Sequence, residues 1–461
     1  MTKQECAIKY ITENYLDYSR LRHDVIADKL QVRMENGWRE MTKHDINSIV
    51  CHAAQEYDAN ITSREVMTAL QSDLIPDVHP LREYVLSCRE WTEEQPDWID
   101  FVASQVKVKP SGESATDRPK GLSERTSCCQ TTTLLDRPYG ADRPMNLTGE
   151  ADLTVSEANG LASNSSQSER SKADHLWRAY FKKWFVAMVA SWMKDEVVNH
   201  QVLVLIGKQG IFKTTWLEHL IPPHLRAYAC KLANSNELNK DERLRIAEFG
   251  LISLDEIDSM NNRELNQLKS IITATDVNER AAYAYTKERR VRLASFCASG
   301  NRRDFLTDIT GNRRWLPFEV ESIQNPFTTI LPYERMYAQA WALANDEFFS
   351  YWFDLDEIEV LELHNQHFRD ESNEEQLLDV YFAVPTTDAT NAKFLTTAEI
   401  SERLIYYGNI KRPLSLSRLG VLLSQKGFLS IRKGSPQRRG WIVYERDNEE
   451  VNAERRILSK T

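Results

Sequence analysis

The stretch "LVLIGKQGIFKTTWLEHLI", residues 203–221, decides the fold. It begins as an uncharged, branched run suited to a buried strand, and helical spacing resumes at Thr214. Between the two halves lie Gly207, Gly210 and Lys213. A glycine-bearing turn between a strand and a helix points backbone N–H groups at an anion, which the helix dipole also favours. The stretch therefore predicts a phosphate-binding loop.

Phe212 departs from the pattern of such loops, which place a glycine immediately before the lysine. We expect its ring to point away from the phosphates and its backbone to avoid conformations that only glycine adopts. Lys213 would contact the β- and γ-phosphates of ATP, and the Thr214 hydroxyl would bind Mg²⁺. For the loop alone, a purely structural turn is the alternative.

Three later segments add the other groups that a nucleotide hydrolase needs. The apolar run "FGLISLDEID" ends in Asp255, a candidate for the metal's water shell, and Glu256, a candidate for activating the attacking water. "RLASFCASGN" ends in Asn301, which could orient water. Arg313 and Arg314 precede a further strand and could stabilise charge in the transition state. Each has a structural alternative, but their order predicts one site at the carboxyl ends of the strands.

Four segments together resemble the virulence-associated protein E (VapE) family. They are "VVNHQVLVLIGKQGIFKTTW", "ISLDEID", "LKSIITATDVNERAAYAYTKERRVRLASFCASGN" and "LTDITGNRRWLPFEV". The resemblance covers roughly 174–320. That family is a P-loop group related to superfamily-3 helicases and is common in phages and integrated mobile elements.

The resemblance implies a role for each motif. It makes Asp255 and Glu256 the Walker B acids, Asn301 the polar sensor, and Arg313 or Arg314 the arginine finger. The Walker A loop would comprise Gly207, Lys208, Gln209, Gly210, Ile211, Phe212, Lys213, Thr214 and Thr215. ATP and Mg²⁺ are the implied cofactors. Relatives often carry a primase-like domain further upstream; none is visible here, so a separate primase stays open as a partner.

Composition narrows the class of protein. The chain has 461 residues, 41% hydrophobic and 27% charged, which is typical of globular domains. A net charge of −10 excludes a polycation, so any surface for nucleic acid must be local. Seven scattered cysteines without zinc spacing indicate reduced thiols in a cytoplasmic protein. The most membrane-like segment, "WFVAMVASWM", is too short to span a membrane and predicts a buried helix.

Alternating apolar strands and helical segments from Val202 to Val320 predict an α/β core with a mostly parallel sheet. The fold class expected is therefore an α/β P-loop (AAA+/superfamily-3-like) ATPase with a helical N-terminal region and a C-terminal winged helix. The expected parts are a mainly helical domain at 1–108, a disordered linker at 109–172, the ATPase domain at 173–350, a helical connector at 351–389, the winged helix at 390–446 and a tail at 447–461.

Two segments carry a net positive charge, in contrast to the negative charge of the whole chain. Between Arg280 and Arg314 stand nine Lys or Arg against three acids, interleaved with tyrosines. Such a loop could grip one DNA strand by phosphate attraction and stacking, as the pore hairpin of superfamily-3 enzymes implies. A solvated basic hairpin with inward tyrosines is the alternative. The contact residues predicted here are Arg280, Tyr283, Lys287, Arg289 and Arg290.

The second segment runs from Lys411 to Arg446, with nine Lys or Arg against one acid. The sequence reads helix, helix, β-hairpin, which indicates a winged helix with Ser415–Gln425 in the major groove of duplex DNA. Winged helices also serve as protein-interaction modules. The predicted DNA contacts are Arg418, Lys426, Arg432, Lys433, Arg438 and Arg439.

These features predict an ATP-dependent DNA helicase or replication-initiation ATPase of a phage or mobile element. Because arginine fingers are commonly supplied by a neighbouring subunit, we expect a homo-oligomeric ring, with a hexamer suspected. The alternative is a nucleotide-dependent DNA-binding switch with slow hydrolysis and no unwinding, which the Phe212 departure favours. A structural adaptor with an inactive loop is the third interpretation.

Overall fold

The structure is a computed structural model, and it describes residues 1–35, 37–110, 161–233, 240–279, 288–306, 311–370, 373–385, 391–408, 415–433 and 437–458. The chain divides into two compact units. The first comprises Met1–Lys109 and Ala173–Arg369, and the second comprises Pro110–Lys172 and Asp370–Thr461.

A six-stranded sheet forms the centre of the first unit, in the order β5-β12-β6-β11-β8-β7. All neighbours are parallel except β5, which pairs antiparallel with β12 at the edge. Every strand expected between Val202 and Val320 is present, so the mostly parallel α/β core is confirmed. The strands are β5 (Val106–Val108), β6 (Val202–Ile206), β7 (Ala229–Ala233), β8 (Leu251–Asp255), β11 (Ser295–Gly300) and β12 (Trp315–Ile323).

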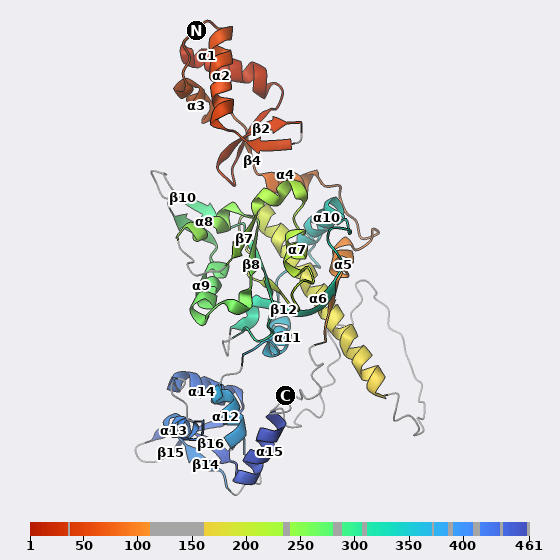
Figure 1. Ribbon diagram of the computed structural model, residues 1–461, viewed down its shortest axis with the longest axis vertical. Helices are drawn as coiled ribbons and strands as arrows, with labels where there is room; N and C mark the ends of the chain where they lie inside the picture. The colour runs from red at the N-terminus through yellow and green to blue at the C-terminus, as the bar shows by residue number, and fades with distance from the viewer. Residues whose placement is uncertain are drawn as a thin grey trace. The chain divides into compact units, whose positions relative to one another are not determined.

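Both faces of this sheet are covered, which is why its strands are apolar throughout. On β6, Leu203 and Leu205 join one hydrophobic core, and Val202, Val204 and Ile206 join the other. Figure 1 shows α6 and α10 on one side of the sheet and α8 and α9 on the other. The helices of this part are α6 (Leu161–Met193), α7 (Lys213–Glu218), α8 (Lys240–Glu248), α9 (Asn262–Thr273), α10 (Tyr333–Ala344) and α11 (Leu355–Gln366).

Helix α6 supplies much of the aromatic core. Its Trp184 indole donates to the Phe296 carbonyl at 3.1 Å, and its Trp192 indole donates to the Gly250 carbonyl at 3.1 Å. Residues 184–192 are fully buried, as predicted for this uncharged run. The helix begins within the stretch expected to be linker. Among the described residues, no helix is long and apolar enough to cross a membrane.

The N-terminal residues form helices around their own hydrophobic core, with a small sheet of order β3-β2-β1-β4. The Thr42 side chain caps α2, and the Thr62 side chain caps α3. Helices α4 and α5 instead pack with α6 in the central core. The elements are α1 (Lys3–Ile11), β1 (Leu21–Asp24), β2 (Lys29–Met34), β3 (Gly37–Glu40), α2 (Lys43–Glu56), α3 (Ser63–Leu70), β4 (Asp77–Val78), α4 (Pro80–Ser87) and α5 (Trp98–Ala103).

A separate two-stranded ribbon lies within the basic segment. Strands β9 (Asp276–Glu279) and β10 (Glu288–Val291) pair antiparallel, with Glu279 opposite Glu288. Arg280, Tyr283 and Lys287, which the sequence places at its turn, lie outside the described residues.

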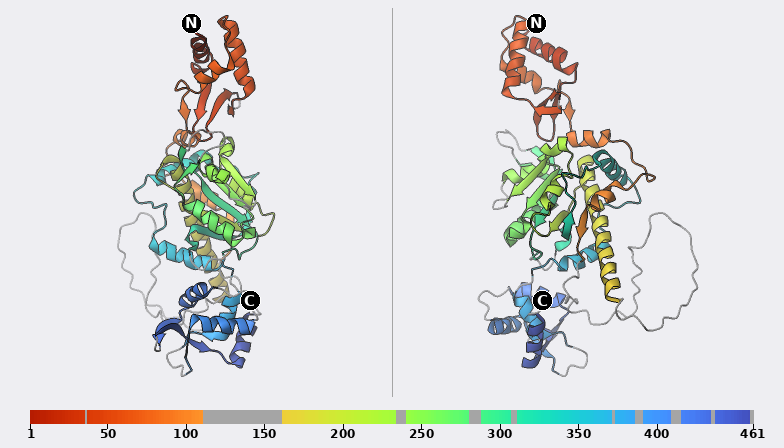
Figure 2. Two further views of the ribbon diagram at one scale, coloured as in Figure 1. Left: turned by 90° about the vertical axis from the view of Figure 1, so that its left-hand side faces the viewer. Right: turned by 45° about the vertical axis from the view of Figure 1, so that its right-hand side comes forward.

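The second unit reads helix, two short strands, two helices, hairpin and helix along the chain. Strand β16 pairs antiparallel with β13, β14 and β15. The Tyr381 ring of α12 stacks on Tyr407 of α13 at 4.2 Å, so α12 belongs to this unit while α11 belongs to the first. The elements, seen in the views of Figure 2, are α12 (Asn373–Tyr381), β13 (Phe382–Ala383), β14 (Lys393–Leu395), α13 (Thr397–Gly408), α14 (Leu416–Gln425), β15 (Leu429–Lys433), β16 (Arg438–Glu445) and α15 (Asn448–Leu458).

Candidate functional site

The loop that follows β6 holds a buried lysine. Lys213 is 7% exposed, and its ammonium donates to the carbonyl oxygens of Gly207 and Lys208, each at 2.7 Å, and to Asn301 Oδ1 at 3.3 Å. Burial lowers the pKa of Lys213, and the carboxylates of Asp258 and Asp255 oppose that shift. A buried ammonium held among neutral oxygens is one that an anion in the loop would stabilise.

The backbone conformation of Phe212 differs from the one expected from the sequence. Its backbone is left-handed, with φ 67° and ψ 17°, immediately before the first residue of α7. The sequence argument held that a non-glycine residue would avoid such a conformation, but the turn requires it, and a non-glycine residue adopts it only at an energetic cost. The ring turns towards Phe327, with centroids 6.4 Å apart and planes at 80°.

The residues expected to hold Mg²⁺ lie together. The Thr214 hydroxyl donates to Asp255 Oδ1 at 3.2 Å, and the Ser299 hydroxyl donates to the same oxygen at 2.8 Å. Lys231 Nζ lies 2.8 Å from Asp255 Oδ2. Burial alone would raise the pKa of Asp255, but the Lys231 ammonium and the two hydroxyls hold it below its ordinary value.

This oxygen set fits Mg²⁺. Carboxylate and hydroxyl oxygens are hard ligands, and Mg²⁺ commonly takes one or two carboxylates and completes its shell with water and substrate phosphates. Across the described residues, no group of three or more His, Cys, Asp or Glu side chains could hold a metal by itself. A cation held by Thr214 and Asp255 would therefore depend on phosphate oxygens for the rest of its shell.

Glu256 and Asn301 lie beside this set. Glu256 follows β8 in a left-handed conformation, φ 53°, with an exposed side chain. Asn301 follows β11, and its backbone N–H donates to Asp258 Oδ1 at 3.2 Å. A Cβ on Gly300 would approach the same Asp258 oxygen to 2.9 Å, so any larger residue there requires the neighbouring side chains to shift.

Sequence reasoning missed Lys231, Asp258 and Ser299. Asp258 carried a usable signal, because it is a third acid in "LDEID" just after the strand that holds Asp255. Ser299 also had one, since it stands two residues before Asn301 near the end of a strand. Lys231 has no such signal, because its role depends on β7 pairing with β8.

Arg313 and Arg314 lie at the amino ends of the strands, opposite the ends that carry the loop and the acids. The expectation that all these residues meet at the carboxyl ends is therefore corrected. They end a single turn, η4 (Asn312–Arg314), that leads into β12. Because β12 runs parallel to β6 with Trp315 opposite Val202, this turn lies at the amino ends of the strands. Five residues of strand, about 17 Å, separate that edge from the phosphate loop.

The predicted DNA-binding residues fall on exposed hairpins and on one helix. Arg289 is 76% exposed and pairs with Asp276, whereas Arg290 lies near Asp28 and Glu248. In the second unit, the Lys426 ammonium is 2.6 Å from Asp379 Oδ2 and 3.4 Å from Glu375 Oε1, so its charge is balanced internally. Arg418 lies in the first turn of α14, and exposed side chains at the hairpin end are Arg432, Lys433, Arg438 and Arg439.

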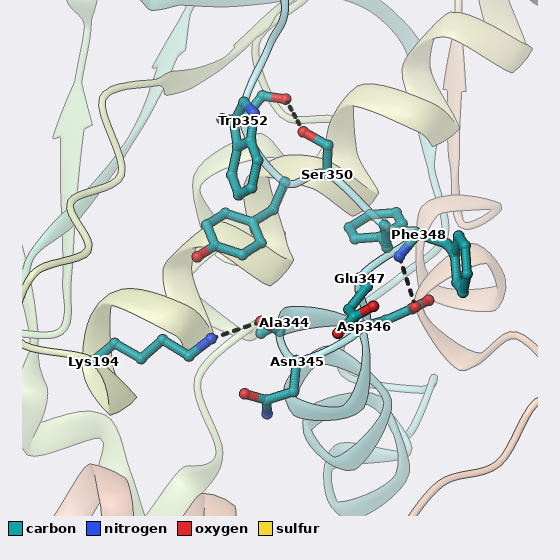
Figure 3. A pocket seen from close by; sticks show the side chains of 10 residues that line it. Lys194, Ala344, Asn345, Asp346, Glu347, Phe348, Ser350 and Trp352 are labelled. Carbon is teal, nitrogen blue, oxygen red and sulfur yellow. Dashed lines mark hydrogen bonds between the residues drawn. The ribbon is translucent and has the colours of Figure 1, made fainter.

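A hollow in the surface lies away from this site. Figure 3 shows Lys194 donating to the Ala344 carbonyl, at 2.8 Å, and Phe348 N–H donating to Asp346. Lys194 follows Trp192, whose indole binds the Gly250 carbonyl just before β8, so the hollow adjoins the amino edge of the sheet. Its lining is Lys194, Ala344, Asn345, Asp346, Glu347, Phe348, Phe349, Ser350, Tyr351 and Trp352.

Comparison with known families gives one match. Residues 157–376 match the virulence-associated protein E-like domain. Over this range the chain is similar to that family. The matched range includes the phosphate loop, strands β6 to β12 and both arginines, so the resemblance inferred from four segments is confirmed. No curated protein matches the chain.

Two solved structures are similar to this chain. One is described as the apo structure of the NrS-1 C terminal region (305-718), with 11% identity, a TM-score of 0.40 and coverage of 95% of this chain and 100% of that one. The other is an A form apo structure of the same region, with 12% identity, a TM-score of 0.39 and coverage of 95% and 100%.

Proposed function

We propose that the chain is an ATP-dependent DNA helicase or replication-initiation ATPase of a phage or mobile element. The observation that carries this proposal is the meeting of two residue pairs at the carboxyl ends of the strands. Lys213 Nζ lies 3.3 Å from Asn301 Oδ1, and the Thr214 hydroxyl lies 3.2 Å from Asp255 Oδ1. Phosphoryl transfer needs little covalent chemistry from the protein, so these charges and hydrogen bonds suffice for its main demands.

Each group has one task in the proposed reaction. Lys213 would leave the loop carbonyls for the β- and γ-phosphates, and Thr214 with Asp255 would hold Mg²⁺, which neutralises the developing charge. Glu256, exposed beside Asp255, would orient the attacking water, and Asn301 would bind the same water or the γ-phosphate. The site residues thus supply positioning and electrostatic stabilisation.

The arginines support a ring of identical subunits. Because Arg313 and Arg314 enter β12 at the amino edge, they lie too far from the loop of their own chain to contact its nucleotide. A neighbour in a homo-oligomer, with a hexamer suspected, would present them to this loop. An arginine supplied in this way raises the rate of phosphoryl transfer by about 10³–10⁵.

The second unit supports a duplex-DNA anchor of the winged-helix type. Within it, β14 is followed by helices α13 and α14 and by the β15–β16 hairpin, and α14 would lie in the major groove with Arg418 in its first turn. On the hairpin, Arg432 faces Arg439 and Lys433 faces Arg438. Like charges directly opposite destabilise a β-ribbon, and DNA phosphates would relieve that repulsion.

A nucleotide-dependent switch is the second candidate. The observation that favours it is the Lys231–Asp255 ion pair, since a metal that binds Asp255 must compete with that ammonium. Slow formation of the active site would then limit turnover, and the protein would bind DNA without unwinding it.

One set of assays tests these proposals. We expect Lys213→Ala to abolish DNA-stimulated ATP hydrolysis and strand displacement, and Glu256→Gln to retain ATP binding while losing turnover. Lys107→Ala is the matched control, because Lys107 is an exposed lysine of the same unit, on strand β5 and outside the proposed site. Hydrolysis without unwinding would favour the switch, and ATP binding without turnover on DNA would refute both proposals.

A further inference from the structure

An aromatic surface borders the phosphate loop on the side away from the acids. Phe327 is 72% exposed, and its ring stands edge-on to Phe212 at 6.4 Å and to His219 at 5.4 Å. Phe212 belongs to the loop and His219 follows α7, whereas Phe327 comes from the connection between β12 and α10. Three segments therefore build one surface.

Hydrogen bonds hold the connection between β12 and α10 at both ends, so Phe327 stays exposed. Gln324 N–H donates to the Gln105 carbonyl at 2.9 Å, and the Tyr333 hydroxyl donates to the His219 carbonyl at 2.7 Å. Between them, Phe327 N–H donates to Asn325 Oδ1 at 3.0 Å. The Phe327 ring is therefore held in solvent beside the loop, in contact with two other rings, where it is free to meet a ligand.

The order of strands indicates which end of a bound nucleotide would lie beside this aromatic surface. β11 and β8, which carry Asn301 and Asp255, flank β6 on one side, and β12 flanks it on the other. Lys213, Thr214 and Asp255 would bind the β- and γ-phosphates and the metal, so the terminal phosphate points towards β11 and β8. The base then points towards the connection that follows β12.

Strand β12 also closely approaches the loop. A Cβ on Gly207 would lie 2.7 Å from the Val320 carbonyl oxygen. The aromatic surface and the loop are therefore adjacent in the same unit, with the Phe327 ring centroid 6.4 Å from that of Phe212 in the loop.

We propose that Phe327, backed by Phe212 and His219, stacks on the base of the bound nucleotide. This proposal rests on the nucleotide site proposed above and adds to it a preference for certain bases. Stacking on an aromatic face tolerates different bases, so we infer a preference for purine over pyrimidine triphosphates with little discrimination between ATP and GTP. Phe212, the departure from the glycine pattern, thereby acquires a role in supporting Phe327.

Binding measurements with and without a base test this directly. Dissociation constants of the full chain would be measured for MgATP, MgGTP, MgCTP and magnesium tripolyphosphate, which has phosphates but no base. We expect Phe327→Ala to weaken MgATP and MgGTP about ten- to a hundredfold and to leave tripolyphosphate unchanged. Phe327→Trp should restore MgATP binding, and Phe212→Gly should weaken it less than Phe327→Ala does.

The control is Ile330→Ala, since Ile330 is 89% exposed on the same connection but makes no ring contact. Unchanged MgATP affinity in Phe327→Ala, or an equal loss for tripolyphosphate, would overturn the stacking proposal while leaving the phosphate site intact. A smaller particle size for Phe327→Ala with normal MgATP affinity would overturn it in favour of a subunit contact. If the native chain bound neither MgATP nor tripolyphosphate, the proposed nucleotide site itself would fail.

Discussion

The two edges of the central sheet carry positive charge in different surroundings. At the carboxyl edge, Lys213 and Lys231 lie among carbonyls and the carboxylates of Asp255 and Asp258. At the amino edge, burial and then Arg313 lower the pKa of Arg314. At the carboxyl ends of the strands the cations thus have carboxylate partners within one chain, whereas the amino ends hold adjacent cations that a phosphate on another molecule would stabilise. This difference is what the proposed division of the site between copies of one chain would require.

The largest expected effect comes from an experiment that tests this comparison by mixing two inactive variants. Arg313→Ala/Arg314→Ala and Lys213→Ala should each lower kcat of ATP hydrolysis about 10³-fold or more, because one loses the arginines and the other the loop lysine. Mixed together, they should regain a measurable part of the activity, since an intact loop can meet intact arginines of a neighbour. Steady-state ATPase of the mixture measures this, with labelled chains showing that subunits exchange. Exchange without recovery would mean that the arginines do not act across an interface.

A smaller effect is expected at Gly300, on the carboxyl edge. Its added Cβ would lie 2.8 Å from Ile206 Cδ1 and 2.9 Å from Asp258 Oδ1. We expect Gly300→Ala to lower the free energy of unfolding by about 1–3 kcal/mol, as overpacking does. Denaturant unfolding measures this.

Gly420→Ala provides the control, because its Cβ would meet nothing nearer than 3.9 Å within helix α14. Alanine there should be neutral or should stabilise by about 0.5–1 kcal/mol. Equal effects at the two glycines would contradict the close packing of Asp258 against β11.

The smallest effect concerns His364, which lies near the amino half of β12. Burial lowers its pKa to about 4, and its Nε2 is 2.6 Å from the Pro317 carbonyl. Because the folded chain holds this imidazole neutral, the unfolded chain binds more protons between pH 6.5 and pH 4, and stability falls as the pH falls through that window. Between pH 7 and pH 6 the loss should be about 1 kcal/mol.

Unfolding free energies at the two pH values, compared with those of His364→Gln, measure this contribution. Glutamine can still donate to the Pro317 carbonyl but does not titrate in this range. An identical pH dependence in the two proteins would contradict the assignment to His364.

Much of the fold could be predicted from the sequence because buried parallel strands are apolar on both faces. "VLVLI", "LISL" and "SFCASG" are read as strands without any knowledge of their neighbours. Residues at the ends of those strands, Lys213, Thr214, Asp255 and Asn301, were found for the same reason. Contacts that depend on strand order, such as Lys231 with Asp255, leave no pattern along the chain.

The arginines and Phe212 show two further limits. Arg313 and Arg314 were grouped with the loop by order in the sequence, although residues that precede a parallel strand lie at its amino end. Phe212 was judged by the conformations that side chains prefer, whereas the turn between β6 and α7 fixes φ at 67° and the ring gains Phe327 as a neighbour. Tertiary context decided both.

The Lys231–Asp255 contact has a consequence for the form in which a nucleotide arrives. In the proposed site, the Lys231 ammonium already neutralises the Asp255 carboxylate. Free ATP would bring only negative charge to this ion pair, whereas its magnesium chelate would bring a cation that can take over Asp255 as Lys231 withdraws. The proposed site would therefore exchange one cation for another, and we expect it to take up the chelate as a single ligand.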